Sequence, residues 1–485
     1  MKPPQLFDRE REWADLERFA SQDGRGIAIV YGRRRQGKSF LLTALAREHG
    51  GFYHQALEEE RRPALRTFAR TLGTYAGTSA VGAISFDDWE AALGVTVKVA
   101  AGRPIVIDEF PYLLRKSPEL PSAIQSLYDA ASDGRQPPFR LILCGSALSV
   151  MSGLLTGQRA LRGRASMDLL VTPFDHRLSR RFWGIKDHHA ALLVDATLGG
   201  PPGYRDLLDG RAPATGADFP EWLATGILDP SHALFREAEY LLAEDPALAD
   251  RALYQTIVGA VARGTSTRGG LANEMGRPST ALEYPLAQLE RARMLVRDED
   301  LLRSNRPLLR LADPVLRFDF AVTRPDRARF EARRTAEAWA DAEPRFRSQV
   351  LGPHFEGMAT DWARTHASTR TLGGRPGRVG FARVDSSEEG KGYELDVVVE
   401  AAGERVDGRA RLLAIGEAKS SERPRTMADI GRLRRLRAAL GRRADVSGTK
   451  LLLFGRSGFD ASVRREARTH RDIELVDLAR LYEGD

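Results

Sequence analysis

The stretch IAIVYGRRRQGKSFLLTALA, residues 27–46, decides the fold of the first part of the chain. It joins an apolar run suited to a buried strand to a helical run through the loop GRRRQGKS, Gly32–Ser39. This loop has the pattern G-x-x-x-x-G-K-[ST], in which backbone N–H groups curl around phosphate oxygens at the start of a helix. We expect Lys38 to reach the β- and γ-phosphates and the Ser39 hydroxyl to bind Mg²⁺. The predicted nucleotide contacts from this stretch are Gly32, Gln36, Gly37, Lys38, Ser39 and Phe40.

A second segment, PIVIDEF at Pro104–Phe110, is an apolar strand that ends in two adjacent acids. Asp108 at the strand end is suited to hold Mg²⁺, directly or through water. Glu109 is suited to orient and deprotonate the attacking water, which makes it the predicted catalytic base. An acid pair at this distance after a phosphate loop is typical of ATP hydrolysis rather than of ATP binding alone.

Polar residues that follow the next strands are further candidates for the same site. Ser146 ends the apolar run LILCGS and is a candidate sensor of the γ-phosphate, although a turn serine would also fit. The stretch LRGR contains Arg162 and Arg164. Arg164 is the candidate to stabilise phosphoryl charge, within the chain or across a subunit interface.

Apolar runs alternate with helical patterns from Gly26 to Phe174, which predicts a parallel sheet covered by helices. The expected strands are Gly26–Tyr31, Gly51–Gln55, Pro104–Asp108, Arg140–Gly145 and Met167–Thr172. Helices are expected at Lys38–His49 and Ser122–Ser132. The stretch Arg180–Ala247 is predicted to be helical, with an interruption at Gly199–Gly203. The proline and the charged residues of Thr323–Arg334 predict a connecting segment before the C-terminal region.

The composition sets limits on the class of protein. The chain has 485 residues, of which 42% are hydrophobic and 29% charged, as in soluble globular proteins. Its formal charge of +7 is compatible with a polyanionic partner, but only eight residues are lysine, so arginine supplies nearly all of the positive charge. The single cysteine, Cys144, excludes an intramolecular disulfide. The sequence shows neither a secretion signal nor a membrane-spanning run, and we expect a cytoplasmic protein.

Taken together, these segments resemble a known family. LFDREREW, VYGRRRQGKS, IVIDEFPYL, CGSALSVM, RGR and LGGPPGYRDLL occur in the order found in the archaeal-type ATPases of the STAND class, which are relatives of the AAA+ and origin-recognition proteins. The resemblance implies an adenine pocket near Phe7 and Arg9. It also implies a helical lid whose turn, Gly200 to Pro202, touches the nucleotide. Ser146 stands where some relatives have Asn.

The region Leu253–Ala321 contains three helical patterns followed by two short strands, at Met294–Asp298 and Pro307–Leu311. This order resembles a winged helix-turn-helix. The residues expected to face DNA are Arg277, Ser279, Thr280 and Glu283. Because this face is not strongly basic and winged helices also bind proteins, contact with DNA and contact with protein both stay open.

The C-terminal region carries a second set of acids. YELDVVVE and RLLAIGEAKSS place Asp396 on one strand and Glu417 and Lys419 on the next, with both acidic segments flanked by apolar residues. An acid followed by acid-x-Lys on adjacent strands resembles the PD-(D/E)xK nucleases, whose helix acid corresponds to Glu356. Asp396, Glu417 and Glu356 would then bind Mg²⁺, and Lys419 would act on water or phosphate. A solvated salt bridge at a strand edge is the alternative.

The predicted architecture is an α/β chain with four parts. Residues 1–178 form a P-loop ATPase domain, 179–247 a helical lid, 248–335 a winged helix-turn-helix, and 336–485 an α/β PD-(D/E)xK-like domain. The leading hypothesis is a Mg-ATP-hydrolysing switch that acts on a DNA-binding, DNA-cleaving C-terminal domain. The alternatives are a signalling scaffold with an inactive nuclease-like domain and a loader without nuclease chemistry. Nucleic acid, with DNA favoured, is the expected partner; the oligomeric state, including a homo-oligomer, stays open.

Overall fold

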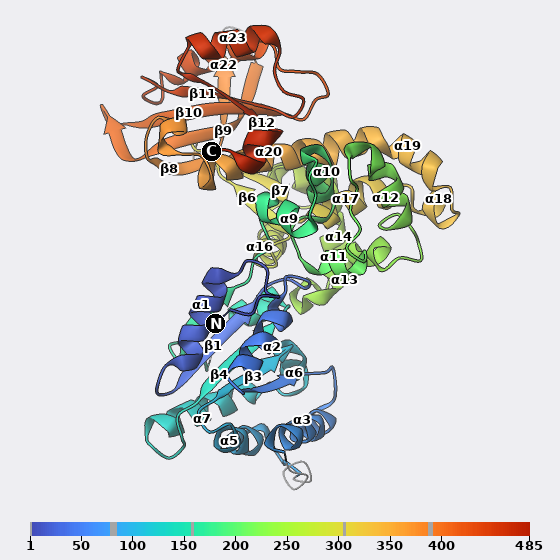
Figure 1. Ribbon diagram of the computed structural model, residues 1–485, viewed down its shortest axis with the longest axis vertical. Helices are drawn as coiled ribbons and strands as arrows, with labels where there is room; N and C mark the ends of the chain where they lie inside the picture. Colours follow the sequence, from blue (N-terminus) through green and yellow to red (C-terminus); the bar gives the residue numbers. More distant parts are fainter. Residues whose placement is uncertain (1, 78–84, 157–159, 304–306, 387–390) are drawn as a thin grey trace. The chain divides into compact units, whose positions relative to one another are not determined.

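The computed structural model describes residues 2–77, 85–156, 160–303, 307–386 and 391–485 (Figure 1). The chain divides into two compact units, each described here by itself. The first comprises residues 1–173, 201–204 and 240–251, and the second comprises residues 174–200, 205–239 and 252–485. Within the described residues, no helix combines the length and apolarity needed to cross a membrane.

The first unit is a parallel sheet between two layers of helices. Its strands are β1 (Gly26–Tyr31), β2 (Phe52–Gln55), β3 (Pro104–Asp108), β4 (Arg140–Gly145) and β5 (Ala165–Leu170). They lie in the order β2-β3-β4-β1-β5, and every pair is parallel. The helices around them are α1 (Glu10–Ser21), α2 (Lys38–Glu48), α3 (Arg61–Ala76), α5 (Trp89–Ala100), α6 (Phe110–Lys116), α7 (Leu120–Ser132) and α8 (Leu148–Gly153).

Alternation along the central strands gives this sheet two apolar faces. Ile27 and Ile29 of β1 pack with residues of α3, α5, α6 and α7 in one core. Ala28 and Val30, which point the other way, pack with α1 and α2 in another core. Because both faces are covered, the strands are continuous apolar runs, as parallel sheets require.

The second unit begins with helices and ends in a mixed sheet. Its helices are α9 (His176–Trp183), α10 (His188–Leu198), α12 (Phe219–Thr225), α15 (Arg268–Met275), α16 (Glu283–Arg291), α17 (Pro314–Phe318), α18 (Arg327–Glu331), α19 (Thr335–Arg345), α20 (Gly352–Thr365), α21 (Thr369–Leu372), α22 (Met427–Leu440), α23 (Ala461–Thr469) and α24 (Leu478–Glu483). Three further helices have residues in both units: α11 (Gly203–Leu207), α13 (Glu237–Glu244) and α14 (Arg251–Ala262). The segment expected to be a connector is partly helical, since it contains α18, whose Phe330 is fully buried.

Helices α14, α15 and α16 are followed by the hairpin of β6 (Leu295–Asp298) and β7 (Leu308–Leu311). We call residues 252–311 the hairpin module. Its order of three helices and two strands agrees with the order predicted from the sequence, and a winged helix remains the interpretation we propose for it.

The C-terminal sheet has the order β12-β11-β10-β9-β8. Its strands are β8 (Pro376–Ser386), β9 (Lys391–Val406), β10 (Arg409–Lys419), β11 (Lys450–Gly455) and β12 (Ile473–Asp477). The first three pair antiparallel and the last three parallel. Helices α22 and α23 cover one face and α20 packs against the other (Figure 1). Residues 336–485 are part of the larger second unit, and the predicted four-part division stays a prediction.

Candidate nucleotide-binding and catalytic site

The phosphate loop lies between the carboxyl end of β1 and the first turn of α2. Gly32 has no room for a side chain, since an added Cβ would lie 2.3 Å from the Val171 carbonyl oxygen. Gly37 has φ +85°, a left-handed conformation that glycine adopts without strain. Both glycines therefore allow the tight loop that ends at the N-terminus of α2. Backbone N–H groups at a helix N-terminus favour the binding of a phosphate.

Four predicted residues lie at the carboxyl ends of three adjacent strands, β3, β4 and β1. Lys38 is buried, and its Nζ donates to the carbonyl oxygen of Arg33 at 2.9 Å. Asp108 is fully buried at the end of β3. Ser146 follows β4, and its Oγ donates to Oε2 of Glu109 at 3.3 Å. The structure thus brings a lysine, two carboxylates and a serine hydroxyl to the same end of the sheet, and these are the kinds of group that ATP hydrolysis requires.

Glu109 is held in an unusual backbone conformation. Its φ is +53°, left-handed for a residue with a side chain, at a cost of about 1–3 kcal/mol. Burial raises the pKa of Glu109 above its ordinary value, and the charge of Asp108 raises it further, while Lys38 opposes both effects. A carboxylate with a raised pKa accepts a proton more readily, so the position suits a general base.

The N-terminal segment reaches the phosphate loop through Arg9. The guanidinium donates to the carbonyl oxygens of Thr172, at 2.7 Å, and Gln36, at 3.3 Å, and pairs with Glu12. Arg9 therefore holds the segment that carries Phe7 against the loop. The contact of Phe7 and Arg9 with adenine stays a prediction.

The segment Pro201–Tyr204 lies against the same loop. Gly203 N donates to the carbonyl oxygen of Arg35 at 3.0 Å, and Pro202 Cγ would lie 3.6 Å from a Cβ added to Gly37. Pro202 thus borders the phosphate loop, which supports the role that the resemblance implies for this turn.

Three residues near the acids were not anticipated. The Tyr53 hydroxyl donates to Oδ2 of Asp108 at 2.7 Å and orients that carboxylate. Asp245 accepts hydrogen bonds from the backbone N of Ser149, at 3.0 Å, and from its hydroxyl. The neighbouring Glu244 contributes to the raised pKa of Glu109. The contact of Tyr53 could have been predicted, because Tyr53 lies in a strand expected to neighbour the strand that ends in Asp108. The contacts of residues 244–245 could not, because no motif in the sequence around them indicates that they pack against the ATPase domain.

The structure contradicts a role for Arg164 at the phosphates of its own chain. Arg164 precedes β5, whose first residue pairs with Ile27 at the amino end of β1, whereas the phosphate loop follows the carboxyl end. Its guanidinium makes two bonds to Asp129, at 2.9 and 3.0 Å. Arg164 therefore lies at the wrong end of the sheet to contact phosphates bound by the loop of its own chain. The LRGR motif alone does not reveal the direction of this strand. Action across a subunit interface stays a prediction.

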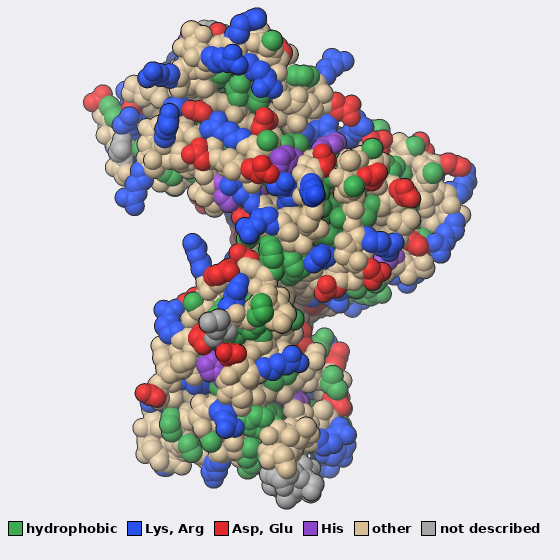
Figure 2. Space-filling model, in the orientation of Figure 1, with side chains coloured by type: hydrophobic (Ala, Val, Ile, Leu, Met, Phe, Trp, Pro, Cys, Tyr) green, Lys and Arg blue, Asp and Glu red, His purple; other side chains and the backbone are tan. Residues whose placement is uncertain are grey.

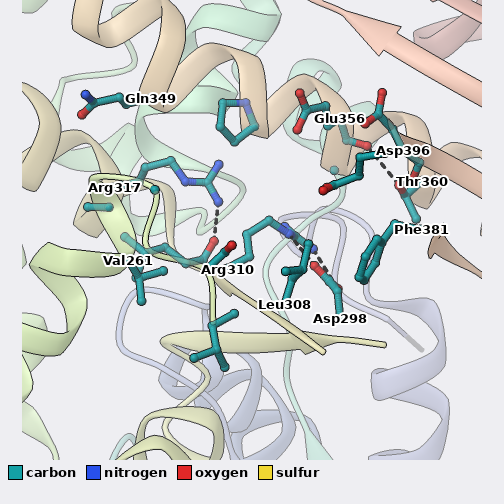
Figure 3. Close-up of a pocket in the computed structure, with 18 of the residues that line it drawn as sticks. Val261, Asp298, Leu308, Arg310, Arg317, Gln349, Glu356, Thr360, Phe381 and Asp396 are labelled. Carbon is teal, nitrogen blue, oxygen red and sulfur yellow. Dashed lines mark hydrogen bonds and ion pairs between the residues drawn. The ribbon is translucent and has the colours of Figure 1, made fainter. Parts of the chain in front are cut away.

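In the C-terminal sheet, Glu356 of α20 and Asp396 of β9 line one cavity (Figure 3). The pairings Gly380 with Val398 and Ala382 with Leu395 show that β9 bulges at residues 396–397. Because of the bulge, Leu395 and Val398 both belong to the core beneath α22. Asp396 instead lines the cavity bordered by α20.

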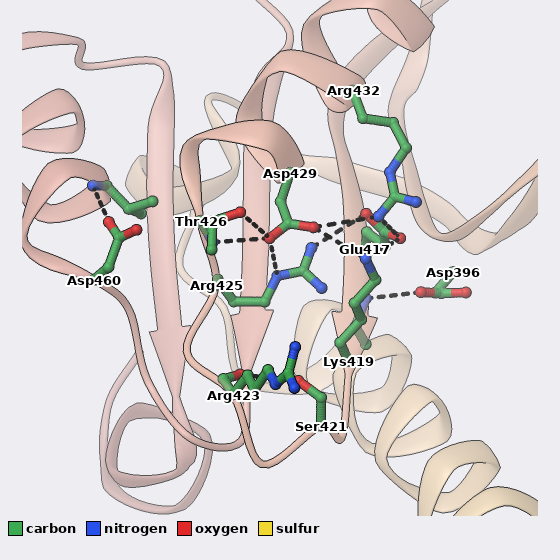
Figure 4. A network of polar contacts seen from close by, with 12 residues as sticks. Asp396, Glu417, Lys419, Ser421, Arg423, Arg425, Thr426, Asp429, Arg432 and Asp460 are labelled. Carbon is green, nitrogen blue, oxygen red and sulfur yellow. Dashed lines mark hydrogen bonds and ion pairs between the residues drawn. The ribbon is translucent and has the colours of Figure 1, made fainter.

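Glu417 faces α22 and is held by cations (Figure 4). Arg425, at 3.1 Å, and Arg432 both donate to its carboxylate, and Lys419 lies 3.6 Å away while pairing with Asp429 at 3.0 Å. No group of three His, Cys, Asp or Glu side chains that could hold a metal ion occurs among the described residues. The predicted ion site shared by Glu356, Asp396 and Glu417 is therefore not formed. The bulge turns Asp396 toward α20, and the two arginines hold the Glu417 carboxylate on the side of α22.

Comparison with known proteins agrees with the geometry of the first unit. Residues 6–188 match the model of a family described as an ATPase domain predominantly from Archaea. The range includes the phosphate loop, the two acids that end β3, and Ser146. This part of the chain is an archaeal-type ATPase domain.

An uncharacterized protein of Methanocaldococcus jannaschii is 24% identical over 303 residues, or 62% of this chain and 64% of that protein. The match thus spans less than two thirds of this relative. The Walker-type ATPase PABY2304 of Pyrococcus abyssi is 21% identical, with a TM-score of 0.48, over 66% of this chain and 97% of that one. The ORC2 protein of Aeropyrum pernix in its ADPNP–ADP complexes is 15% identical, with a TM-score of 0.44, over 69% and 96% of the respective chains. At these scores nothing about activity follows from the two structures.

Proposed function

We propose that the chain is a Mg-ATP-hydrolysing switch whose nucleotide state controls DNA binding by the second unit. The observation that supports hydrolysis most directly is the set of Lys38, Asp108, Glu109 and Ser146 at the carboxyl ends of adjacent strands. Glycines leave room for phosphate, Lys38 supplies positive charge, and Ser39 with Asp108 supplies oxygen ligands that suit Mg²⁺. Bound Mg²⁺ would neutralise developing charge on the phosphates, while Glu109 accepts the proton from water.

The surface of the C-terminal sheet domain supports a nucleic-acid partner. Lys and Arg side chains gather over its outer helices in Figure 2, where α22 and α23 lie. Exposed arginines there and in the adjoining loops include Arg442, Arg443, Arg465, Arg468 and Arg471. Such a surface binds phosphates without reading bases, so the affinity is expected to depend strongly on salt.

DNA binding is expected to weaken steeply with salt and to differ at least about fivefold between the ATP and ADP states. Replacing Arg465 and Arg468 together by Ala should weaken binding at every salt concentration and lower the slope of log K against log salt by about two. Fluorescence anisotropy with labelled duplex and single-stranded DNA measures both effects. The matched control replaces Arg66 and Arg70, which are exposed on α3, by Ala. Equal DNA binding in all nucleotide states would favour the scaffold alternative.

The contacts of Glu417 favour binding without cleavage. Two guanidiniums occupy the carboxylate that a nuclease would use for its metal ion, and Lys419 is bound to Asp429. We therefore expect DNA to stay intact with Mg²⁺ or Mn²⁺, with no nucleotide, ATP or ADP, for linear, nicked and single-stranded substrates. Gel assays test this. Cleavage that disappears in both Asp396→Ala and Glu417→Ala would contradict it and would mean that the arginines release Glu417.

A further inference from the structure

Asp245 belongs to the last stretch of the first unit, residues 240–251. It is buried, with 5% of the residue exposed. Its Oδ2 accepts a hydrogen bond from the backbone N–H of Ser149 at 3.0 Å, and its Oδ1 accepts one from the Ser149 hydroxyl. Oδ1 also accepts the backbone N–H of Ala247 at 3.0 Å. Three donors thus compensate one buried carboxylate, and two of them come from a residue 96 positions earlier in the chain.

Ser149, the distant partner of Asp245, lies in the first turn of α8. This helix begins after Ala147, whose side chain has no group that could accept the free N–H groups of the first turn. The backbone oxygen of Ala147 accepts hydrogen bonds from the N–H groups of Val150, at 3.1 Å, and Met151, at 3.0 Å. Asp245 accepts the N–H of the second helical residue, which is the bond that an N-cap side chain makes. The first turn of α8 is therefore held by a carboxylate from another part of the chain.

The segment before α8 carries Ser146, the candidate sensor of the γ-phosphate. Its hydroxyl donates to Oε2 of Glu109 at 3.3 Å. The preceding Gly145 has no room for a side chain, since an added Cβ would lie 2.4 Å from Cδ of Pro111 in α6 and 3.0 Å from Sδ of Met151 in α8. Because the backbone is wedged between these two helices, the position of Ser146 depends on where α8 lies.

Glu244, the residue before Asp245, acts on the same site through its charge. Burial raises the pKa of Glu109, and the negative charges of Asp108 and Glu244 add to that effect. The pKa of Tyr112 is also raised, first by burial and then by the charges of Glu109 and Glu244. Two adjacent residues of one short segment thus reach the ATPase site, one through hydrogen bonds and the other through its charge.

We propose that Asp245 is a positioning residue of the ATPase site, which fixes Ser146 through α8 and links its response to the γ-phosphate to the segment that continues into α14. Only residues 246–250 separate Asp245 from the start of α14, and the chain enters the second unit after residue 251. A displacement of Ser146 on gain or loss of the γ-phosphate then reaches Asp245, and a displacement of Asp245 reaches Ser146, since coupling between sites is reciprocal. The inference rests on the proposed switch and names the contact through which it is regulated.

Asp245→Asn keeps the size of the side chain and changes its hydrogen bonding. The amide has one acceptor oxygen and one NH₂ group, whereas the carboxylate meets three donors with its two oxygens. In either orientation of the amide, its NH₂ group therefore faces a backbone N–H group, that of Ser149 or that of Ala247. Ser149→Ala removes only the hydroxyl contact, and Ser149→Thr retains it.

The test uses the full chain and measures the affinities for ADP and for a non-hydrolysable ATP analogue, together with single-turnover hydrolysis of ATP. Asp245→Asn should weaken binding of the analogue about fivefold and leave ADP binding unchanged, because ADP lacks the phosphate that Ser146 senses. Hydrolysis should slow about tenfold. Ser149→Ala should show a smaller loss of the same kind, and Ser149→Thr should match the wild type. The double variant of Asp245→Asn and Ser149→Ala should be no more impaired than Asp245→Asn alone.

Asp88→Ala is the matched control, because the Asp88 carboxylate accepts the N–H of Ala91 at 2.8 Å in the first turn of α5, a contact of the same kind. It should lower the unfolding temperature without changing the ratio of the two nucleotide affinities. Equal losses of both affinities in Asp245→Asn, unchanged hydrolysis, or fully additive effects in the double variant would overturn the proposal. Should Asp245→Asn not fold, equal behaviour of Ser149→Ala and Ser149→Thr would overturn it.

The link to α14 has its own measurement. Asp245→Asn should bring the ratio of the DNA affinities in the ATP and ADP states close to one. A ratio that keeps its wild-type value in this variant would overturn the link. A wild-type chain whose DNA binding is independent of nucleotide would instead contradict the proposed switch, and the two nucleotide affinities would still decide whether Asp245 positions Ser146.

Discussion

Glu109→Gln is expected to bind Mg-ATP with near-normal affinity and to hydrolyse it about 10²–10⁴-fold more slowly. The amide keeps the size of the side chain and can still contact the Ser146 hydroxyl, but it accepts no proton from water. Glutamine is as tolerant as glutamate of the left-handed backbone at this position, so folding should be preserved. Single-turnover hydrolysis and nucleotide binding, measured on the same preparation, separate the two effects.

The control for this variant is Glu119→Gln, because Glu119 is an exposed acid that pairs with Arg61. It should hydrolyse ATP at the wild-type rate. If Glu109→Gln also does so, Glu109 is not the base, and Glu244, whose negative charge also raises the pKa of Glu109, becomes the acid to test.

Lys38→Ala is expected to weaken ATP and ADP binding by at least about a hundredfold. The reason is that this buried ammonium, bonded to the Arg33 carbonyl inside the loop, is placed to contact the β- and γ-phosphates. Titration with a fluorescent nucleotide measures the loss, and thermal unfolding checks that the fold is retained. Lys116→Ala, which removes an exposed lysine paired with Glu60, should bind normally. Near-normal binding by Lys38→Ala would disprove the assignment of the phosphate site.

The sequence predicted the central strands of the ATPase domain residue for residue, since β1, β3 and β4 are apolar runs with clear ends. The predicted strand Met167–Thr172 begins and ends two residues after the observed β5, Ala165–Leu170. β5 is an edge strand with partly exposed residues, so its start carries little apolar signal. Lys38, Asp108 and Glu109 could be predicted because strand ends and a glycine loop position them locally.

The arrangement of the C-terminal acids could not be predicted, because it depends on contacts between residues far apart in the sequence. Asp396 and Glu417 sit opposite each other if β9 is regular, but a bulge turns Asp396 toward α20. Arg432 and Arg425 reach Glu417 from segments that follow β10. The LRGR motif likewise does not reveal that Arg164 precedes the amino end of β5, away from the phosphate loop of its own chain; its action across a subunit interface stays a prediction.

The backbone passes between the two compact units at five points, after residues 173, 200, 204, 239 and 251. A fragment that stops at residue 188 would keep the phosphate loop but lose Gly203, which bonds to Arg35, and Asp245, which bonds to Ser149. The first unit is therefore made of three separate stretches of the chain, and a fragment that ends at a single peptide bond within residues 174–239 does not contain all of it. In the intact chain, the residues of the first unit are therefore joined to the second unit by five peptide connections rather than by one linker.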